Sequence, residues 1–163
     1  MDPAVIKPTN ISIASNATAE LVYPDYDIVI SCSPRPSPNL SEKLKSRYIH
    51  FVCSTGKVGS RQLRSQWRKI DRTLDFFSPS DRILITCSTG KDLAVGVALA
   101  MICWYCDKDG TLCPGGAPGR RDKVLIRKRL NWIISSMPAA APSRATLQSV
   151  NACVLGESYQ YRD

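Results

Sequence analysis

Residues 82–101 read RILITCSTGKDLAVGVALAM, and this stretch decides the fold. Residues 83–86 are mostly β-branched and apolar, which predicts a buried strand that ends at Cys87. A short loop containing Gly90 follows, and then an apolar run that predicts a helix buried in the core. Because the free amides at the N-terminus of a helix attract anions, the sequence predicts an anion-binding cradle with a thiol at its centre.

The predicted cradle consists of the loop residues and a second, similar loop. Its expected phosphate-binding members are Cys87, Ser88, Thr89, Gly90, Lys91 and Asp92, together with Lys57. Lys57 is included because the sequence CSTGK occurs twice, at 53–57 and at 87–91, each time between a predicted strand and a predicted helix. The carboxyl ends of parallel strands meet at one edge of a sheet, so both lysines are expected to face one crevice there.

The loop resembles the phosphate loop of the cysteine-dependent phosphatases, in which Cys, two residues, Gly, two residues and Arg surround a phosphate. Cys87 and Gly90 match this pattern, but Leu93 stands at the arginine position. The general acid of such enzymes normally follows the preceding strand, and residues 43–70 contain no Asp or Glu. Since both the phosphate-binding fork and the proton donor are replaced, we expect no phosphatase activity.

The hydrophobic pattern predicts one α/β domain over residues 1–163, with a mostly parallel sheet flanked by helices. Strands are predicted at 11–15, 26–32, 48–53 and 82–87, and a short helix at 16–21. A second helix is predicted to start at the N-cap Ser60 and to bury Leu63, Trp67, Ile70, Leu74 and Phe77, and a third follows the cradle. The last two helices are predicted at 122–136, with Val124, Leu125, Trp132 and Ile133 inward, and after the N-cap Ser143, with Leu147, Val150 and Val154 inward. The ends 1–10 and 156–163 and the Gly- and Pro-rich segment 107–120 are expected to be flexible.

The net charge of +8 is concentrated in two segments, 57–72 and 119–130, each with six basic residues and one aspartate. Concentrated positive charge indicates a polyanionic partner, and nucleic acid is the commonest one. The candidate RNA contacts are Arg61, Arg64 and Arg68 in the first segment and Arg120, Arg121, Lys123 and Arg127 in the second. The alternative is that both segments are solvated helix faces.

The seven cysteines favour a reducing, cytoplasmic environment, since their number is odd and several lie in apolar runs. Cys103 and Cys106 are interpreted as packing residues, because one histidine, His50, provides no convincing fourth ligand for a metal; no metal site is expected. The longest apolar run, 93–106, is too short for a membrane span, so no membrane association is expected.

Three segments together resemble one family: CSTGKDLAVGVALAMIC at 87–103, RKRLNWIISSMP at 127–138 and PSRATLQSVNACVL at 142–155. They are similar to the C-terminal portion of fungal and plant initiator-tRNA ribosylphosphate transferases, and the resemblance covers residues 11–155. It implies a dual-specificity-phosphatase-like fold. It also implies that the parent enzyme transfers a phosphoribosyl group from phosphoribosyl pyrophosphate to a 2′-hydroxyl of initiator tRNA. No tightly bound cofactor is implied. The implied partners are initiator tRNA and the N-terminal part of the same enzyme.

The role of Asp92 stays open between two possibilities. Near a 2′-hydroxyl it could act as a catalytic general base, whereas at the start of its helix it would cap free amides, which is the favoured interpretation. Two rival functions are also considered. One is a pseudophosphatase module that binds phosphopeptides or phosphoinositides; the other is an active phosphatase whose arginine comes from elsewhere, for instance Arg61.

Overall fold

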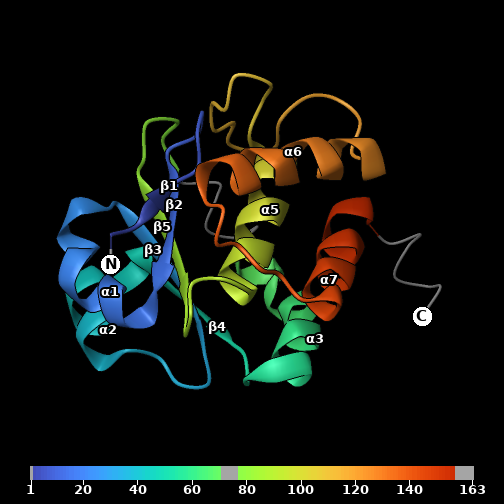
Figure 1. The fold of residues 1–163 in the computed structure, drawn as a ribbon. Helices are drawn as coiled ribbons and strands as arrows, with labels where there is room; N and C mark the ends of the chain where they lie inside the picture. Colours follow the sequence, from blue (N-terminus) through green and yellow to red (C-terminus); the bar gives the residue numbers. More distant parts are fainter. Residues whose placement is uncertain (1, 71–76, 157–163) are drawn as a thin grey trace.

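The computed structural model describes residues 2–70 and 77–156, and its centre is one five-stranded sheet (Figure 1). The strands are β1 (Ala4–Val5), β2 (Ile11–Ser15), β3 (Ile28–Ser33), β4 (Tyr48–Val52) and β5 (Ile83–Cys87). Their order is β1-β2-β5-β3-β4, with β1 antiparallel to β2 and the other pairs parallel. The predicted α/β fold with a mostly parallel sheet is therefore confirmed.

Helices cover both faces of the sheet (Figure 1). They are α1 (Asn16–Val22), α2 (Pro38–Leu44), α3 (Gly56–Gln66), α5 (Leu93–Tyr105), α6 (Lys123–Ser136) and α7 (Arg144–Leu155), with short 3₁₀ turns at Tyr23–Asp25 and Lys45–Arg47. α1 and α2 lie on one face, and α3, α5, α6 and α7 lie on the other. Because both faces are covered, β5 is buried along its whole length, as parallel strands usually are.

The helix after β5 is the centre of the larger core. All of its residues from Ala94 to Cys103 are buried, and α3, α6 and α7 pack around it. Burial raises the pKa of Cys103 and of Cys106 to about 12, so both remain protonated thiols at neutral pH. α7 approaches closely at Gly96, where a Cβ atom would lie 2.4 Å from Cγ2 of Thr146.

The start of α3 differs from the prediction. Ser60 is not its N-cap: the helix begins at Gly56, after Thr55, and Ser60 lies fully buried inside it. The Ser60 hydroxyl is 2.9 Å from Oγ1 of Thr146, so this serine joins α3 to α7. Leu63, Trp67, Ile70 and Phe77 are buried as expected, whereas Leu74 lies outside the described residues.

Three further segments depart from the expected pattern. Residues 2–10, predicted to be a loose end, carry β1 and the fully buried Ile6. The proline-rich segment after β3 contains α2, which starts at Pro38 behind the cap residue Ser37. In α6 Ile133 is buried as expected, but the buried side chain in the first turn is Ile126 rather than Val124, which is 53% exposed.

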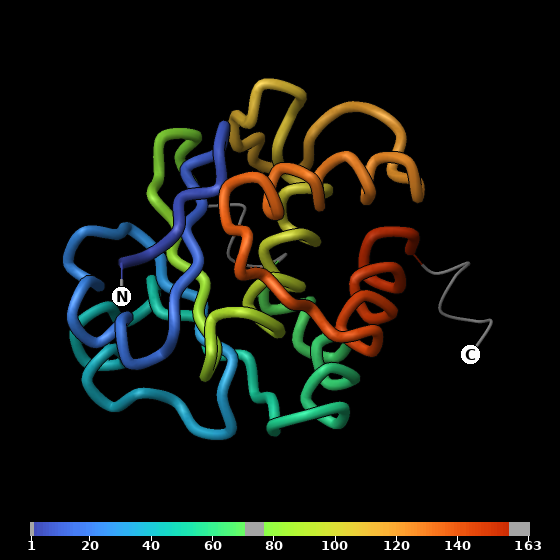
Figure 2. The backbone as a smooth tube through the Cα atoms, viewed as in Figure 1, coloured from blue at the N-terminus to red at the C-terminus, as the bar shows by residue number. Residues whose placement is uncertain are grey.

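The chain that leads from α5 to α7 first passes around the C-terminal end of α5 and then returns to the N-terminal end of α5 (Figure 2). Segment 107–120 has one isolated bridge, Cys106 with Leu112, and buries Leu112 and Ala117; its predicted flexibility stays a prediction. The linker from α6 to α7 passes the cradle, where the Ala141 amide donates to the Lys91 carbonyl at 2.8 Å. Among the described residues, no helix is both long and apolar enough to cross a membrane.

Candidate phosphate-binding site

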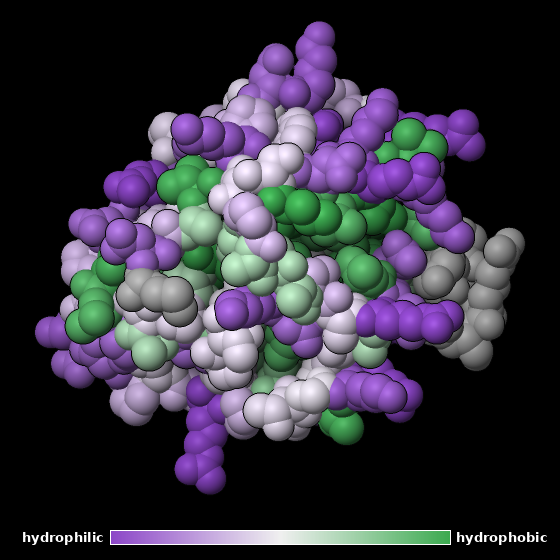
Figure 3. Space-filling view, viewed as in Figure 1, coloured by the Kyte–Doolittle hydropathy of each residue, from purple (hydrophilic) through white to green (hydrophobic). Residues whose placement is uncertain are grey.

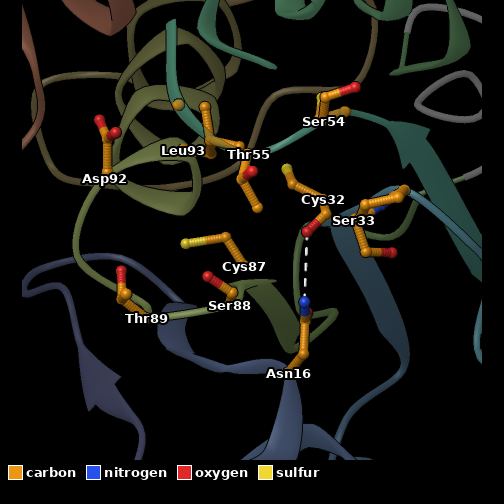
Figure 4. Close-up of a pocket in the computed structure, with 13 residues that line it drawn as sticks. Asn16, Cys32, Ser33, Ser54, Thr55, Cys87, Ser88, Thr89, Asp92 and Leu93 are labelled. Atoms are coloured by element: carbon orange, nitrogen blue, oxygen red, sulfur yellow. Dashed lines mark hydrogen bonds between the residues drawn. The ribbon is translucent and has the colours of Figure 1, made fainter. Parts of the chain in front are cut away.

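A pocket of about 180 Å³ opens at the carboxyl edge of the parallel sheet (Figure 4). Three parts of the chain line it: Cys87, Ser88, Thr89, Asp92 and Leu93 of the cradle loop; Cys53, Ser54, Thr55 and Gly56 of the second CSTGK loop; and Asn16, Cys32, Ser33 and Pro34 from the ends of β2 and β3. The structure therefore brings the two CSTGK loops together around one cavity. Leu93, the residue at the arginine position, is part of the wall.

The cradle loop is folded tightly over Cys87. The Gly90 amide donates to the Cys87 sulfur at 3.2 Å, and the Lys91 amide donates to Oγ1 of Thr89 at 3.1 Å. Gly90 has φ +73°, and a Cβ atom there would lie 2.8–3.0 Å from backbone atoms of Ala14 and Ser15. Only glycine fits this close approach without strain, because the conformation is left-handed and the neighbours are backbone.

Asp92 neither caps its own helix nor stands free. It occupies the N-cap position of α5 without a side-chain hydrogen bond to that helix. Its Oδ1 instead accepts from the Ser143 amide at 2.8 Å and from the Thr146 hydroxyl at 2.6 Å. The favoured interpretation, that Asp92 caps its own helix, is therefore wrong. Its carboxylate instead binds the N-terminus of α7 and joins that helix to the cradle. A negative charge at that helix end is favoured by the helix dipole.

Replacing Asp92 by Ala is expected to lower the free energy of unfolding by about 2 kcal/mol, since two hydrogen bonds to a charged acceptor are lost in a half-buried place. Chemical denaturation of both proteins measures the change. Asp81→Ala, at a surface turn between α3 and β5, serves as the comparison and is expected to cost less. An unchanged midpoint for Asp92→Ala would show that the carboxylate does not hold α7 to the cradle.

The two lysines of the CSTGK loops do not line the pocket. Lys91 is exposed and borders another cavity, of about 110 Å³, together with Met137 and Ala139. Lys57 is exposed on the first turn of α3, next to the pocket residue Gly56. Lys91 therefore lies outside the pocket and Lys57 follows its wall in sequence, and their contact with a phosphate stays a prediction.

Three thiols converge on the pocket from three adjacent strand ends. Cys32 and Cys87 are among the labelled side chains around it, and Cys53 belongs to the same lining (Figure 4). The hydrogen bond with Cys53, together with burial, raises the pKa of Cys32 well above its usual value. The same hydrogen bond lowers the pKa of Cys53, with a smaller contribution from the charge of Lys69.

Sequence reasoning missed Asn16, which holds the site together. Its amide nitrogen donates to the Cys32 carbonyl at 3.2 Å, and its Oδ1 accepts from the Thr86 hydroxyl at 2.7 Å. These bonds tie the start of α1 to β3 and β5. The available signal was position alone, because Asn16 follows a strand whose carboxyl end lies at the same edge as Cys87.

The two basic segments lie at different places. Lys57, Arg61 and Arg68 are exposed along α3 and just after it, and Arg64 is half-buried. The second group lies on and before α6, where hydrophilic side chains gather along the upper margin of Figure 3: Arg120, Lys123, Arg127 and Lys128 are exposed. This second basic group lies near the C-terminal end of α5, whereas the cradle lies at the N-terminal end of the same helix. Because α5 has 13 residues, its two ends are about 20 Å apart.

Arg121 is used within the fold. Its guanidinium lies 3.8 Å from the centre of the Trp104 ring and donates to the carbonyls of Trp104 and Ala117. The Arg121 guanidinium therefore binds the C-terminal end of α5, where a positive charge is favoured by the helix dipole. Arg121 therefore has a structural role, and its contact with RNA stays a prediction; its neighbour Arg120 has a side chain 89% exposed.

Comparison with known proteins identifies the family to which this chain belongs. A family model described as the Rit1 DUSP-like domain matches residues 47–154. The chain belongs to this family. The tRNA A64-2′-O-ribosylphosphate transferase of Saccharomyces cerevisiae is 32% identical to it over 114 residues, which are 66% of this chain and 22% of that protein. The chain thus spans about a fifth of the length of this curated relative.

Solved structures confirm the phosphatase-like fold of this Rit1-family domain. The PTP-2 phosphatase of Cydia pomonella superimposes with a TM-score of 0.65 at 13% identity, over 91% of this chain and 88% of its own. The Yvh1 phosphatase domain of Chaetomium thermophilum gives 0.58 at 16% identity, over 91% and 92%. At such low identities these similarities concern the fold alone.

Proposed function

We propose that this chain is the phosphate- and tRNA-binding domain of an initiator-tRNA ribosylphosphate transferase, and that it acts in the cytoplasm with the rest of that enzyme as its partner. The observation that carries the proposal is the family match over residues 47–154, which includes both CSTGK loops of the pocket. The relative's name supplies the reaction. The donor that we propose, phosphoribosyl pyrophosphate, is the one that the sequence resemblance implies. The seven free thiols favour a reducing compartment.

The pocket suits a phosphate group for electrostatic reasons. It lies where α5 begins, so the partial positive charge of the helix N-terminus points toward it. The Gly90 amide donates to the Cys87 sulfur, so an anion that takes this amide must displace the thiol. A ligand that also takes the Lys91 amide must displace the hydroxyl of Thr89, which accepts from that amide in the unliganded domain.

The exposed basic residues of α3 give the tRNA a path to the pocket. The helix begins at Gly56, in the wall of the pocket, and carries Lys57 and Arg61 outward from there. Arg120, Lys123 and Arg127, about 20 Å away along α5, would contact a second stretch of backbone. Contacts of this kind give affinity without reading sequence. The affinity of this chain for initiator tRNA at increasing salt concentration tests the proposal.

No phosphatase activity is expected from this domain. Leu93 cannot hold phosphate oxygens as an arginine does, and losing one transition-state donor alone costs about 10²–10³ in rate. Hydrolysis of an aryl phosphate by the wild type should therefore equal that of Cys87→Ser. Turnover that is present in the wild type and absent in Cys87→Ser would contradict this part of the proposal, and loss of turnover in Arg61→Ala would then identify the arginine.

A further inference from the structure

Two of the three thiols at the phosphate pocket lie next to each other on neighbouring strands. Cys32 is in β3, where the parallel register pairs it with Phe51 of β4, and Cys53 directly follows β4. The Cys53 amide donates to the Ser33 carbonyl at 3.1 Å, so the ladder between the two strands continues to Cys53. Because side chains alternate along a strand, Cys53 and Phe51 point to the same side of the sheet, and this is also the side of Cys32.

The sulfur atoms of these two residues are within hydrogen-bonding distance. The Cys32 thiol donates to the Cys53 sulfur. The third thiol of the pocket has a different partner, because the Cys87 sulfur accepts from the Gly90 amide at 3.2 Å. Figure 4 shows the Cys87 sulfur directed away from Cys32. Cys32 and Cys53 are therefore the pair that the fold brings together.

The two thiols differ in acidity, which gives each a separate role. The hydrogen bond from Cys32 lowers the pKa of Cys53 against the effect of burial, and the same bond raises the pKa of Cys32. Since the thiolate is the reactive form of cysteine, Cys53 is the expected nucleophile, and Cys32 is the thiol that resolves its oxidised form. Burial raises the pKa of Cys103 and of Cys106 to about 12, so these two thiols are expected to be inert.

The pocket gives a small oxidant access to this pair. Cys32 and Cys53 are only 2% and 1% exposed, yet both line the pocket of about 180 Å³ at the edge of the sheet. A water molecule occupies about 30 Å³ in the liquid, so the pocket has room for a hydroperoxide group. An activated thiolate in an accessible pocket, beside a second thiol, is the usual setting of a redox-sensitive cysteine.

We propose that Cys32 and Cys53 form a reversible redox pair that closes to a disulfide when a hydroperoxide enters the pocket. The Cys53 thiolate attacks a peroxide oxygen, the O–O bond breaks, and Cys53 becomes a sulfenic acid; with hydrogen peroxide, the released hydroxide takes up a proton and leaves as water. Cys32 then loses its proton and its sulfur attacks the sulfenic sulfur. The S–S bond forms, and the sulfenic hydroxyl leaves with that proton as a second water. The two thiols together lose two electrons and two protons, and the peroxide takes up both.

The disulfide would form in the wall of the pocket. It would join the C-terminal part of β3 to the first residue of the second CSTGK loop, and both segments line the cavity. A thiol reductant reopens the bond by exchange, as expected for a transient disulfide in a compartment that otherwise keeps the seven cysteines free. The pair needs the open pocket for this reaction but no bound phosphate.

Disulfide mapping of the full wild-type chain by mass spectrometry tests the proposal. The reduced protein is treated with a small molar excess of hydrogen peroxide at neutral pH, free thiols are blocked with N-ethylmaleimide in urea, and the chain is digested with trypsin. The pocket cysteines separate in this digest, because Cys53 lies in peptide 48–57, Cys87 in peptide 83–91 and Cys32 in a peptide that ends at Lys43. We expect a product that links the Cys32 and Cys53 peptides, loss of two of the seven thiols, and full recovery after dithiothreitol.

Two variants distinguish this pair from thiols that react through exposure alone. Cys53→Ser should form no linked product, and Cys32 should be oxidised at least about tenfold more slowly, since the activated thiolate is gone. Cys113→Ser is the matched control: it removes a half-exposed thiol, and it should form the bond between Cys32 and Cys53 at the wild-type rate. Thermal unfolding checks that both variants are folded, and the wild-type map alone decides the question if Cys53→Ser is not.

Three results would overturn the proposal. A product that links Cys32 to peptide 83–91 would show that Cys87 is its partner. Recovery of Cys32 and Cys53 in the alkylated form after Cys113 has been oxidised would show that the pair does not respond to peroxide. Equal rates of oxidation at Cys53 and at the inert Cys103 would show that the contact with Cys32 does not activate Cys53.

Discussion

Gly59→Ala is expected to destabilise the domain by at least about 3 kcal/mol, the upper range for overpacking a filled site. A Cβ atom at this position would lie 1.7 Å from the Ser54 carbonyl oxygen and 2.8 Å from its carbon. Both are backbone atoms of the loop that lines the phosphate pocket, so no side chain can move aside to make room. Either α3 or the second CSTGK loop must shift.

The shift would spread because α3 is tied to α7 next to Gly59. Ser60 bonds the Thr146 hydroxyl, and its carbonyl accepts from the Ser149 hydroxyl. Urea denaturation measures the loss as a lower midpoint. Val58→Ala, one position away and 58% exposed, is the matched control and should stay within about 0.5 kcal/mol of the wild type. A Gly59→Ala protein as stable as the wild type would show that α3 does not pack against Ser54 this closely.

Replacing Lys57, Arg61 and Arg68 together by Ala is expected to weaken initiator-tRNA binding roughly a hundredfold at 0.1 M salt. Each of the three side chains is exposed on or just after α3, and each is proposed to neutralise one backbone phosphate. Losing three such contacts should also reduce the slope of log K against log salt by about 2 to 3. Fluorescence anisotropy with labelled tRNA at several salt concentrations measures both quantities.

A charge-matched variant controls for the loss of net charge. Lys7, Lys43 and Lys108 are also exposed and lie outside both basic segments. Their joint replacement by Ala removes the same charge from other parts of the surface. If this variant and the α3 variant lose equal affinity, the attraction comes from overall charge, and α3 is not the RNA-binding surface.

The central unit of the fold could be predicted from sequence because it is encoded locally. The apolar run through Ile83 and Ile85 ends at Cys87, and the helix that follows has hydrophobic residues on all sides, so strand, loop and buried helix follow from composition. The parallel arrangement then places Cys53 and Cys87 at one edge. The meeting of the two CSTGK loops is a consequence of topology.

What the sequence could not show depends on contacts between distant residues. The glycines around Ser60 favour a turn locally, but the chain continues as a helix because Gly59 allows α3 to approach the Ser54 carbonyl. The target of Asp92 is a helix that starts 51 residues later, at the Ser143 amide. The stacking of Arg121 on Trp104 likewise has no signal in the distribution of charge.

The most direct test of the account is the affinity of the wild-type chain for initiator tRNA at low and at moderate salt. The account predicts binding at micromolar concentration or tighter that falls steeply as salt rises, because exposed basic residues beside the phosphate pocket neutralise the tRNA backbone. Absence of binding at low salt would contradict it: the basic segments would then be solvated surface, and tRNA recognition would belong to another part of the enzyme.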